Sequence, residues 1–281
     1  MLRKTGIFLV AASLPVFADF SFEETSKITG GMMSGVVSAA AGLPAQAREP
    51  VVHTVAVKGN RMMRTGPHKG SIVDLDKETI TEINFDKKEY SVMTFEEMNG
   101  RLAAISPGRN AGGAPRNYHA STKETGRTRQ IGGVTAREQI ITVEMGDAGQ
   151  TSGVRMGMTL TSDLWVGPQA EGYDEMVDFR KRMSEKLNWT PDGMGAQPGM
   201  LGAVAELTKA SIGVNGTPLS QKMTIGNPMR AQAGAQAPVA QGIVIEMTTE
   251  YRGFSNAAVA DGKFQVPAGF QQVEPALMRR R

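Results

Sequence analysis

The chain has 281 residues, with 31 lysines and arginines against 28 aspartates and glutamates, so its formal net charge at neutral pH is +3. A basic run closes the chain at residues 279–281, but a run this short does not make the broad basic surface that nucleic-acid binding needs. The chain contains no cysteine, which excludes disulfides, thiolate metal sites and cysteine nucleophiles. Abundant glycine (33 residues) and few aromatic residues (6%) favour a turn-rich β protein over a helical bundle.

The first 18 residues predict a secretory signal peptide. They combine a short basic start, an apolar run at 7–14, and small residues at Val16 and Ala18, the −3 and −1 positions of a cleavage site. The apolar run is far shorter than the roughly 20 residues of a membrane span, and a buried N-terminal helix is the alternative. We expect an exported, periplasmic protein that begins near Asp19, is soluble after cleavage and has no transmembrane segment.

The first half of the mature chain predicts one strand and then consecutive hairpins. Residues 20–29 are expected to form a strand with Phe20 and Phe22 on one face, and the small apolar segment at 31–41 a short helix. From residue 51, short β-rich runs alternate with polar turns, which is typical of antiparallel hairpins in a meander. These runs are VVHTVAVKGNRMMRTG, SIVDLD, TITEINF and EYSVMTF. A short helix at 96–104 is expected to close this unit.

The second half predicts further strands and two helices. Strands are expected at 118–125, 128–145, 154–167, 218–225 and 242–253, with a hairpin corner at Gly132-Gly133 and a closing segment at 262–275. Helices are expected at 173–187, where apolar residues recur at helical spacing, and at 200–210. Residues 106–117 and 227–241 have the composition of flexible insertions. The whole pattern predicts one α+β domain over residues 19–281.

Acidic residues crowd residues 71–98 (SIVDLDKETITEINFDKKEYSVMTFEEM). They are Asp74, Asp76, Glu78, Glu82 and Asp86. The first three match the opening ligand positions of a calcium loop, but the glycine and the glutamate that such a loop needs at positions six and twelve are here Thr79 and Phe85. Side-chain alternation fits the stretch better, with Val73 and Leu75 inward and the two aspartates outward in water. We therefore expect the polar side and corners of hairpins, and no metal site.

No motif with an assured chemistry is present. His53, His68 and His119 lie in separate segments without zinc-ligand spacing. There is no G-x-S-x-G elbow and no P-loop, and the glycines at 193–199 have the wrong spacing for a dinucleotide loop. A hydrolase assembled in space from scattered serine, histidine and aspartate stays open as an alternative. We predict no catalytic, metal-binding or cofactor-binding residue, no cofactor, and no enzymatic activity.

Methionine is the unusual component, with 18 in the chain and pairs at Met32-Met33, Met62-Met63 and Met156/Met158. Three interpretations are open. The thioethers can fill an ordinary core, line an adaptable apolar cavity, or bind Cu(I) in an oxidising compartment.

Several segments carry a resemblance to a known family. The run MRTGPHKGSIVDLDKETITEINFDKKEYSVMTFEEM, then GRTRQIGGVTAREQIITVEM, LTSDLWVG and FQVPAGFQQVEP, resemble in the same order an uncharacterised family of exported bacterial proteins. The resemblance covers most of the mature chain apart from 106–117 and 227–241. It implies a fold akin to the LolA/LolB lipoprotein carriers, which is a strongly curved antiparallel half-barrel with a few helices packed on its concave side.

These features predict a soluble periplasmic binding or carrier protein for an apolar ligand such as a lipid or acyl chain. The alternative is a non-enzymatic structural or interaction module of the cell envelope, for which the protein partner is unknown. The candidate cavity-lining residues are the apolar ones expected on the inner wall and the facing helix, namely Val73, Leu75, Ile83, Phe85, Tyr90, Val92, Met156, Met158, Leu160, Met176 and Met183.

Overall fold

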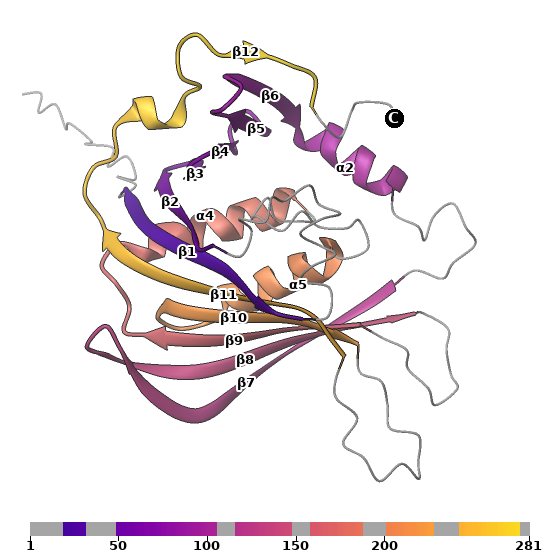
Figure 1. Ribbon diagram of the computed structural model, residues 1–281, viewed down its shortest axis with the longest axis vertical. Helices are drawn as coiled ribbons and strands as arrows, with labels where there is room; N and C mark the ends of the chain where they lie inside the picture. Colours follow the sequence, from indigo (N-terminus) through magenta and orange to yellow (C-terminus); the bar gives the residue numbers. More distant parts are fainter. Residues whose placement is uncertain are drawn as a thin grey trace, which may run out of the picture.

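The computed structural model describes residues 19–31, 49–105, 116–147, 158–187, 201–227 and 242–275 (Figure 1). The predicted signal peptide at 1–18 and nearly all of the predicted helix at 31–41 lie outside these ranges. So do nearly all of the two predicted insertions at 106–117 and 227–241, together with Met156.

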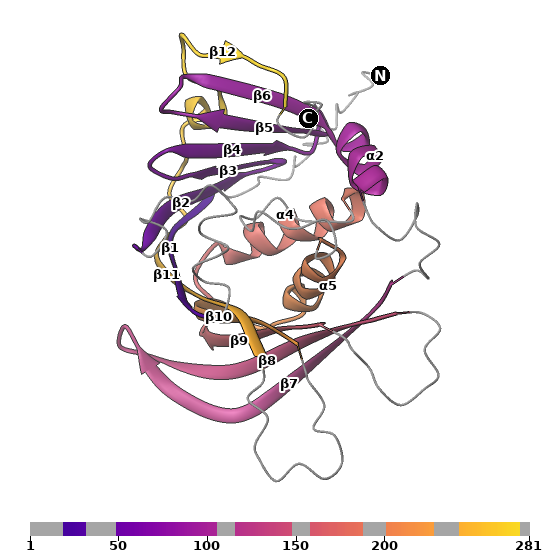
Figure 2. The same cartoon turned by 45° about the vertical axis from the view of Figure 1, so that its right-hand side comes forward.

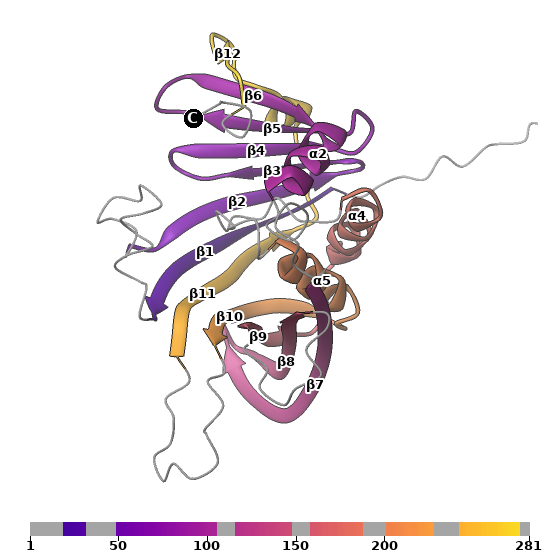
Figure 3. The same cartoon turned by 90° about the vertical axis from the view of Figure 1, so that its right-hand side faces the viewer.

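The described strands form one open sheet of 12 strands in the order β12-β6-β5-β4-β3-β2-β1-β11-β10-β9-β8-β7. Neighbouring strands are antiparallel except β12 and β6, which are parallel. The strands are β1 (Phe20–Gly30), β2 (Val51–Lys58), β3 (Arg61–Thr65), β4 (Lys69–Asp74), β5 (Thr79–Asn84), β6 (Glu89–Thr94), β7 (Arg116–Ile131), β8 (Val134–Asp147), β9 (Met158–Gly167), β10 (Thr217–Asn227), β11 (Gly242–Ser255) and β12 (Gln271–Gln272). Figure 3 shows β2 to β6 side by side in chain order, which confirms the predicted meander.

Local sequence explains the hairpin corners. Gly132 and Gly133, between β7 and β8, have φ angles of +57° and +81°. A two-residue hairpin turn of the primed type needs positive φ at both central positions, and glycine adopts it without strain. The predicted corner at this glycine pair is confirmed.

Three α-helices lie in the described ranges, α2 (Phe95–Ile105), α4 (Tyr173–Lys186) and α5 (Leu201–Ile212), and a short 3-10 helix, η3, spans Asp261–Phe264. They confirm the helices predicted at 96–104, 173–187 and 200–210, and with the sheet they confirm the α+β class. A reciprocal cap begins α2, because the Glu97 amide donates to Thr94 Oγ1 at 3.1 Å and the Thr94 amide donates to Glu97 Oε2 at 2.8 Å.

Helices α4 and α5 pack on the same face of the sheet, and Figure 2 shows the β6 end and the β7 end of the sheet on opposite sides of them. The α4 cluster joins that helix to β1–β6 and comprises Phe20, Phe22, Val55, Val57, Met62, Val73, Leu75, Ile80, Met93, Phe95, Met98, Tyr173, Met176, Phe179, Met183 and Leu187. The α5 cluster joins that helix to β8–β10 and comprises Ile141, Val143, Met145, Leu160, Ala203, Val204, Leu207 and Ile225. The inner face is therefore the helix-covered one.

The opposite, outer face of β2–β6 is covered by the C-terminal strap, residues 256–275. Val259 and Phe264 of the strap pack on Met63, Ile72 and Ile83. Polar contacts tie the strap down, since Lys58 Nζ donates to the Val259 carbonyl at 2.9 Å and an Arg61 guanidinium nitrogen lies 2.8 Å from Asp261 Oδ1. At its end, β12 extends the sheet beyond β6. The C-terminal strap, which has little regular secondary structure, thus covers the apolar surface on the outer face of β2–β6.

The structure corrects one expectation about the acidic stretch at 71–98. Asp76 is exposed, but Asp74 is only 8% exposed, so the prediction that both aspartates are outward in water is wrong for Asp74. Its Oδ1 accepts the amides of Asp76 at 3.1 Å and Lys77 at 2.9 Å, and these bonds close the β4–β5 turn. A carboxylate buried in this way satisfies turn amides that otherwise have no partner.

We expect Asp74→Ala to lower the free energy of unfolding by about 1–2 kcal/mol, because the two turn amides lose their acceptor. Asp74→Asn keeps a carbonyl oxygen at the same place and is the matched control, with a smaller loss. Urea unfolding at pH 7 measures both. Equal losses in the two variants would contradict an acceptor role for Asp74.

Candidate functional site

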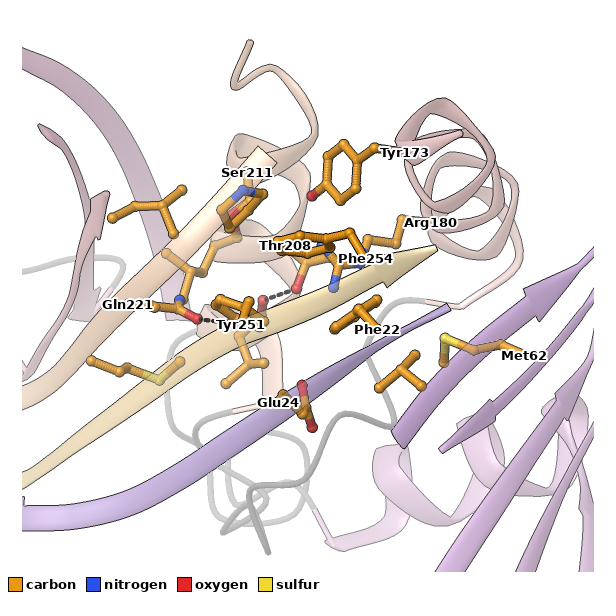
Figure 4. Close-up of a pocket in the computed structure, with 16 residues that line it drawn as sticks. Phe22, Glu24, Met62, Tyr173, Arg180, Thr208, Ser211, Gln221, Tyr251 and Phe254 are labelled. Atoms are coloured by element: carbon orange, nitrogen blue, oxygen red, sulfur yellow. Dashed lines mark hydrogen bonds between the residues drawn. The ribbon is translucent and has the colours of Figure 1, made fainter. Parts of the chain in front are cut away.

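A cavity of about 130 Å³ lies between α4, α5 and the middle of the sheet (Figure 4). Its apolar wall comes from strands on both halves of the sheet and from α5, and comprises Phe22, Val55, Met62, Leu164, Val204, Leu207, Pro218, Met223 and Phe254. Its polar wall comprises Glu24, Tyr173, Arg180, Thr208, Ser211, Gln221 and Tyr251. The cavity is therefore amphipathic and lies where the α4 and α5 clusters meet.

Strand β1 places the centre of this wall. It pairs with β2 on one side and β11 on the other, so that Glu24 stands opposite both His53 and Tyr251. Since side chains alternate along a strand, Phe22 and Glu24 share the inner face. The Phe22 ring lies 6.0 Å from the rings of Tyr251 and Phe254, and these contacts form a packed aromatic floor.

Hydrogen bonds join the polar groups on β9, β10 and β11. The Tyr251 hydroxyl donates to Gln221 Oε1 at 2.7 Å, and Gln221 Nε2 donates to Ser162 Oγ at 2.9 Å. Ser162 is fully buried. A satisfied network of this kind stabilises one arrangement of the wall, because each partner would be costly to bury alone.

Glu24 belongs to a second polar group with Arg64 and His53. Arg64 Nε donates to Glu24 Oε1 at 2.5 Å, and an Arg64 terminal nitrogen lies 3.1 Å from His53 Nδ1. Burial, and then the Arg64 guanidinium, lower the pKa of His53 to about 4. His53 is therefore neutral at pH 7, accepts from Arg64 at Nδ1 and carries its proton on Nε2. The 3.9 Å approach of Glu24 to His53 is accordingly not an ion pair, whereas Arg64 is a charged partner of Glu24.

Arg180 is a cation within the apolar stripe of α4. It follows Tyr173 by seven residues and Met176 by four, so it faces the sheet as they do. Figure 4 shows Arg180 and Tyr173 extending from this helix toward the cavity. Burial raises the pKa of Tyr173, and the charge and hydrogen bond of Arg180 partly offset that rise.

Two acidic residues, the buried Glu138 and the partly buried Asp163, lie on the outer face of β8 and β9, away from the cavity. Glu138 is 1% exposed, accepts the Thr125 hydroxyl at 2.6 Å and pairs with Arg127 at 3.2 Å. Burial, and next the charge of Glu138, raise the pKa of Asp163. Within the described ranges, no group of three histidine, aspartate or glutamate side chains is arranged to hold a metal ion.

The predicted cavity-lining residues occupy three places. Val73, Leu75, Met176 and Met183 belong to the α4 cluster, and Leu160 to the α5 cluster. Ile83, Phe85 and Tyr90 pack on the outer face under the C-terminal strap, and Val92 shares that face by strand register. Met158 begins β9, and Met156 lies outside the described residues.

The residues predicted to build one wall thus divide between two faces of the sheet, and none of those described lines the cavity. The β4–β5 turn pairs Val73 with Ile80, which puts Ile80 on the inner face. Ile83 lies three residues after Ile80 on the same strand, and because successive side chains point to opposite faces, Ile83 lies on the outer face.

The histidines are placed as follows. His53 binds Arg64, and His68 Nδ1 lies 3.0 Å from an Asp86 carboxylate oxygen at an exposed position. His119 is exposed on β7. Among the hydrogen bonds of the described residues, neither His53 nor His68 contacts a serine or threonine hydroxyl, which the hydrolase alternative requires.

The sequence analysis missed Arg180, Gln221 and Tyr251 as cavity residues. The sequence does contain one signal for Arg180. This residue follows Met176 by four positions and Tyr173 by seven, so it is a charged residue within an otherwise apolar helix stripe. Gln221 and Tyr251 carry no such signal, since a polar residue on an inner strand face is visible only once strand register is known.

Comparison with known proteins gives no relative on which to base a function: no protein-family model matches the chain, and no curated protein matches it. The family resemblance therefore stays a prediction that rests on the quoted segments. In the described part of the chain, no helix is both long enough and apolar enough to cross a membrane.

Proposed function

We propose that the protein is a non-enzymatic, exported carrier or sensor of an apolar ligand such as a lipid or acyl chain, and that it works in the periplasm. The observation that carries the proposal is the amphipathic cavity between α4, α5 and the sheet. In this proposal the sheet acts as a curved half-barrel of the LolA/LolB kind, and α4 and α5 form its lid. Support comes from the packing of both helices on one sheet face.

The size of the cavity defines what binding requires. At about 130 Å³ it is close to an apolar cavity of about 150 Å³ that holds benzene, and it is smaller than the roughly 300–1,000 Å³ of most ligand sites. A longer chain therefore needs the helices to move outward. Each methylene then buried contributes about 0.8 kcal/mol, which offsets the lost helix–sheet contacts.

Partly exposed polar contacts hold the C-terminal end of α4 on the sheet. An Arg182 guanidinium nitrogen donates to the Gly59 carbonyl at 3.0 Å. Lys186 Nζ donates to the Leu75 carbonyl at 3.1 Å and to Glu78 Oε1 at 2.6 Å. Partly exposed pairs of this kind contribute about 0–1 kcal/mol each, so they position the helix without preventing its displacement.

Titration with N-phenyl-1-naphthylamine, an uncharged dye that fluoresces in apolar surroundings, tests the proposal. We expect saturable binding to the wild-type chain. Thr208→Phe places a ring in the cavity and is expected to raise the Kd at least tenfold, or about 1.4 kcal/mol. Val134→Phe adds the same ring at the exposed β7–β8 corner and is expected to leave the Kd unchanged. Absence of dye binding, or equal binding by both variants, would count against the cavity as the ligand site.

The alternative function is a structural or interaction module of the cell envelope. The small volume of the cavity and the side-chain packing of the α4 and α5 clusters favour it. The same titration separates the two, because a module that uses only its surface has no saturable internal site for the dye.

A further inference from the structure

We propose that the cavity selects an amphiphile with an uncharged hydroxyl head group, such as a fatty alcohol, and that this hydroxyl binds between Tyr173 of α4 and Thr208 and Ser211 of α5. This inference rests on the proposed function and adds the head-group chemistry of the ligand. Its basis is the supply of hydrogen-bond donors and acceptors in the polar wall, which differs between the two helices.

Helix α5 offers acceptors to the cavity. Thr208 and Ser211 lie three residues apart, on one face of the helix, and both line the cavity. Each hydroxyl already donates its proton to a carbonyl of the preceding turn, Thr208 Oγ1 to Val204 at 3.0 Å and Ser211 Oγ to Leu207 at 2.8 Å. Because a hydroxyl carries one proton and two lone pairs, these two side chains can make further hydrogen bonds only as acceptors.

Helix α4 offers a donor. The Tyr173 hydroxyl accepts a hydrogen bond from Arg180, since a guanidinium can only donate. Burial raises the pKa of Tyr173, so its hydroxyl keeps its proton at pH 7 and can donate it. Figure 4 shows Tyr173 reaching from α4 toward the cavity that Thr208 and Ser211 line from α5. A ligand hydroxyl can accept from Tyr173 and donate to α5, whereas an ether oxygen can only accept.

The charged residues of the lining disfavour an ionised head group. Among the described residues that line the cavity, the charged ones are one cation, Arg180, and one carboxylate, Glu24, and their charges sum to zero. Both have partners, because Arg180 binds Tyr173 and Glu24 pairs with Arg64. A carboxylate or ammonium head group would bring an excess charge into this lining, which is costly away from water. An uncharged head group avoids that cost.

Calorimetric titration of the wild-type chain at pH 7 with 1-octanol, octyl methyl ether, octanoate and octylammonium tests the inference. The four share an alkyl chain and differ in the head group, and the ether is more apolar than the alcohol. We expect octanol to bind about fivefold more tightly than the ether, the effect of one neutral hydrogen bond. We expect it to bind at least about tenfold more tightly than either ion, because of the cost of an excess buried charge.

The outcomes separate this inference from the proposed function. Binding of the ether, of octanoate or of octylammonium as tight as that of octanol, or tighter, would overturn the inference and leave the proposed function standing. Absence of binding by all four compounds would overturn both.

A double variant locates the preference. Thr208→Val with Ser211→Ala removes both acceptor hydroxyls at nearly constant volume, and is expected to bring the octanol and ether affinities within about twofold of each other. Thr128→Val with Ser121→Ala makes the same two changes at exposed positions of β7 that do not line the cavity, so it should keep the full preference. A full preference in the first double variant would overturn the assignment to α5. The wild-type comparison decides whether the cavity selects a hydroxyl even if that variant does not fold.

Discussion

Replacing Phe179 by alanine is expected to lower the free energy of unfolding by about 3–5 kcal/mol, the usual cost of removing a buried aromatic ring. Phe179 is 0% exposed and belongs to the α4 cluster, where it packs with side chains from the sheet. The ring is among the largest fully buried side chains of the described residues. Its loss leaves a void beneath the helix that forms one side of the cavity, and the neighbouring side chains only partly fill such a void.

Urea unfolding followed by far-UV circular dichroism measures this effect. Asp178→Ala is the matched control, since Asp178 is the preceding residue of the same helix and is exposed, and its effect should stay within about 0.5 kcal/mol. A loss below about 1 kcal/mol for Phe179→Ala would mean that α4 does not pack on the sheet in solution, because the usual cost of removing a buried ring is far larger. The lid assigned to α4 would then have to be abandoned.

Acid is expected to destabilise the protein through His53 by about 3 kcal/mol between pH 7 and pH 4. The folded pKa is lowered to about 4 from an ordinary 6.5, a difference of about 2.5 that corresponds to about 3 kcal/mol. A histidine with a lowered folded pKa binds more protons when unfolded, so its stabilising contribution is complete above pH 6.5. The contribution is lost as the pH falls through 6.5 toward 4.

The free energy of unfolding of wild type and His53→Gln, measured at pH 7, 6, 5 and 4, isolates this contribution from that of the carboxylates. Glutamine keeps an acceptor for Arg64 and does not titrate, so the wild type should lose about 3 kcal/mol more than the variant over this range. His68→Gln is the control, because the His68 side chain is 70% exposed. Parallel pH profiles for wild type and His53→Gln would contradict a buried neutral ring at this position.

The hairpins were predictable because their causes are local. The glycine pair at 132–133, the reciprocal cap at Thr94 and Glu97, and the alternation of β4 and β5 each depend on residues close together in the chain. The face on which a strand residue lies was less predictable. Val73 and Ile83 were assigned to one wall, and the turn register places them on opposite faces.

The burial of both faces of β2–β6 was not predictable from the strands. A strand in which apolar and polar residues alternate normally has one buried face and one solvent-exposed face. Here residues 256–275, which follow these strands by about 200 positions in the sequence, cover the second face. The burial of Asp74 was not predictable either. Its own pattern gives it a polar, outward position, and only its packing shows how little of it water reaches.

The sequence by itself determined the α+β class, the order of the strands and helices, and the absence of cysteine chemistry, because periodicity, turn residues and composition act over short distances. The tertiary structure decided where a site exists. The cavity depends on β1 pairing with β11, where Glu24 meets Tyr251, and on α4 carrying Arg180 over that junction. The pairing of β1 with β11 joins residues more than 200 positions apart. Their register is set by packing across the whole sheet, which no local pattern records.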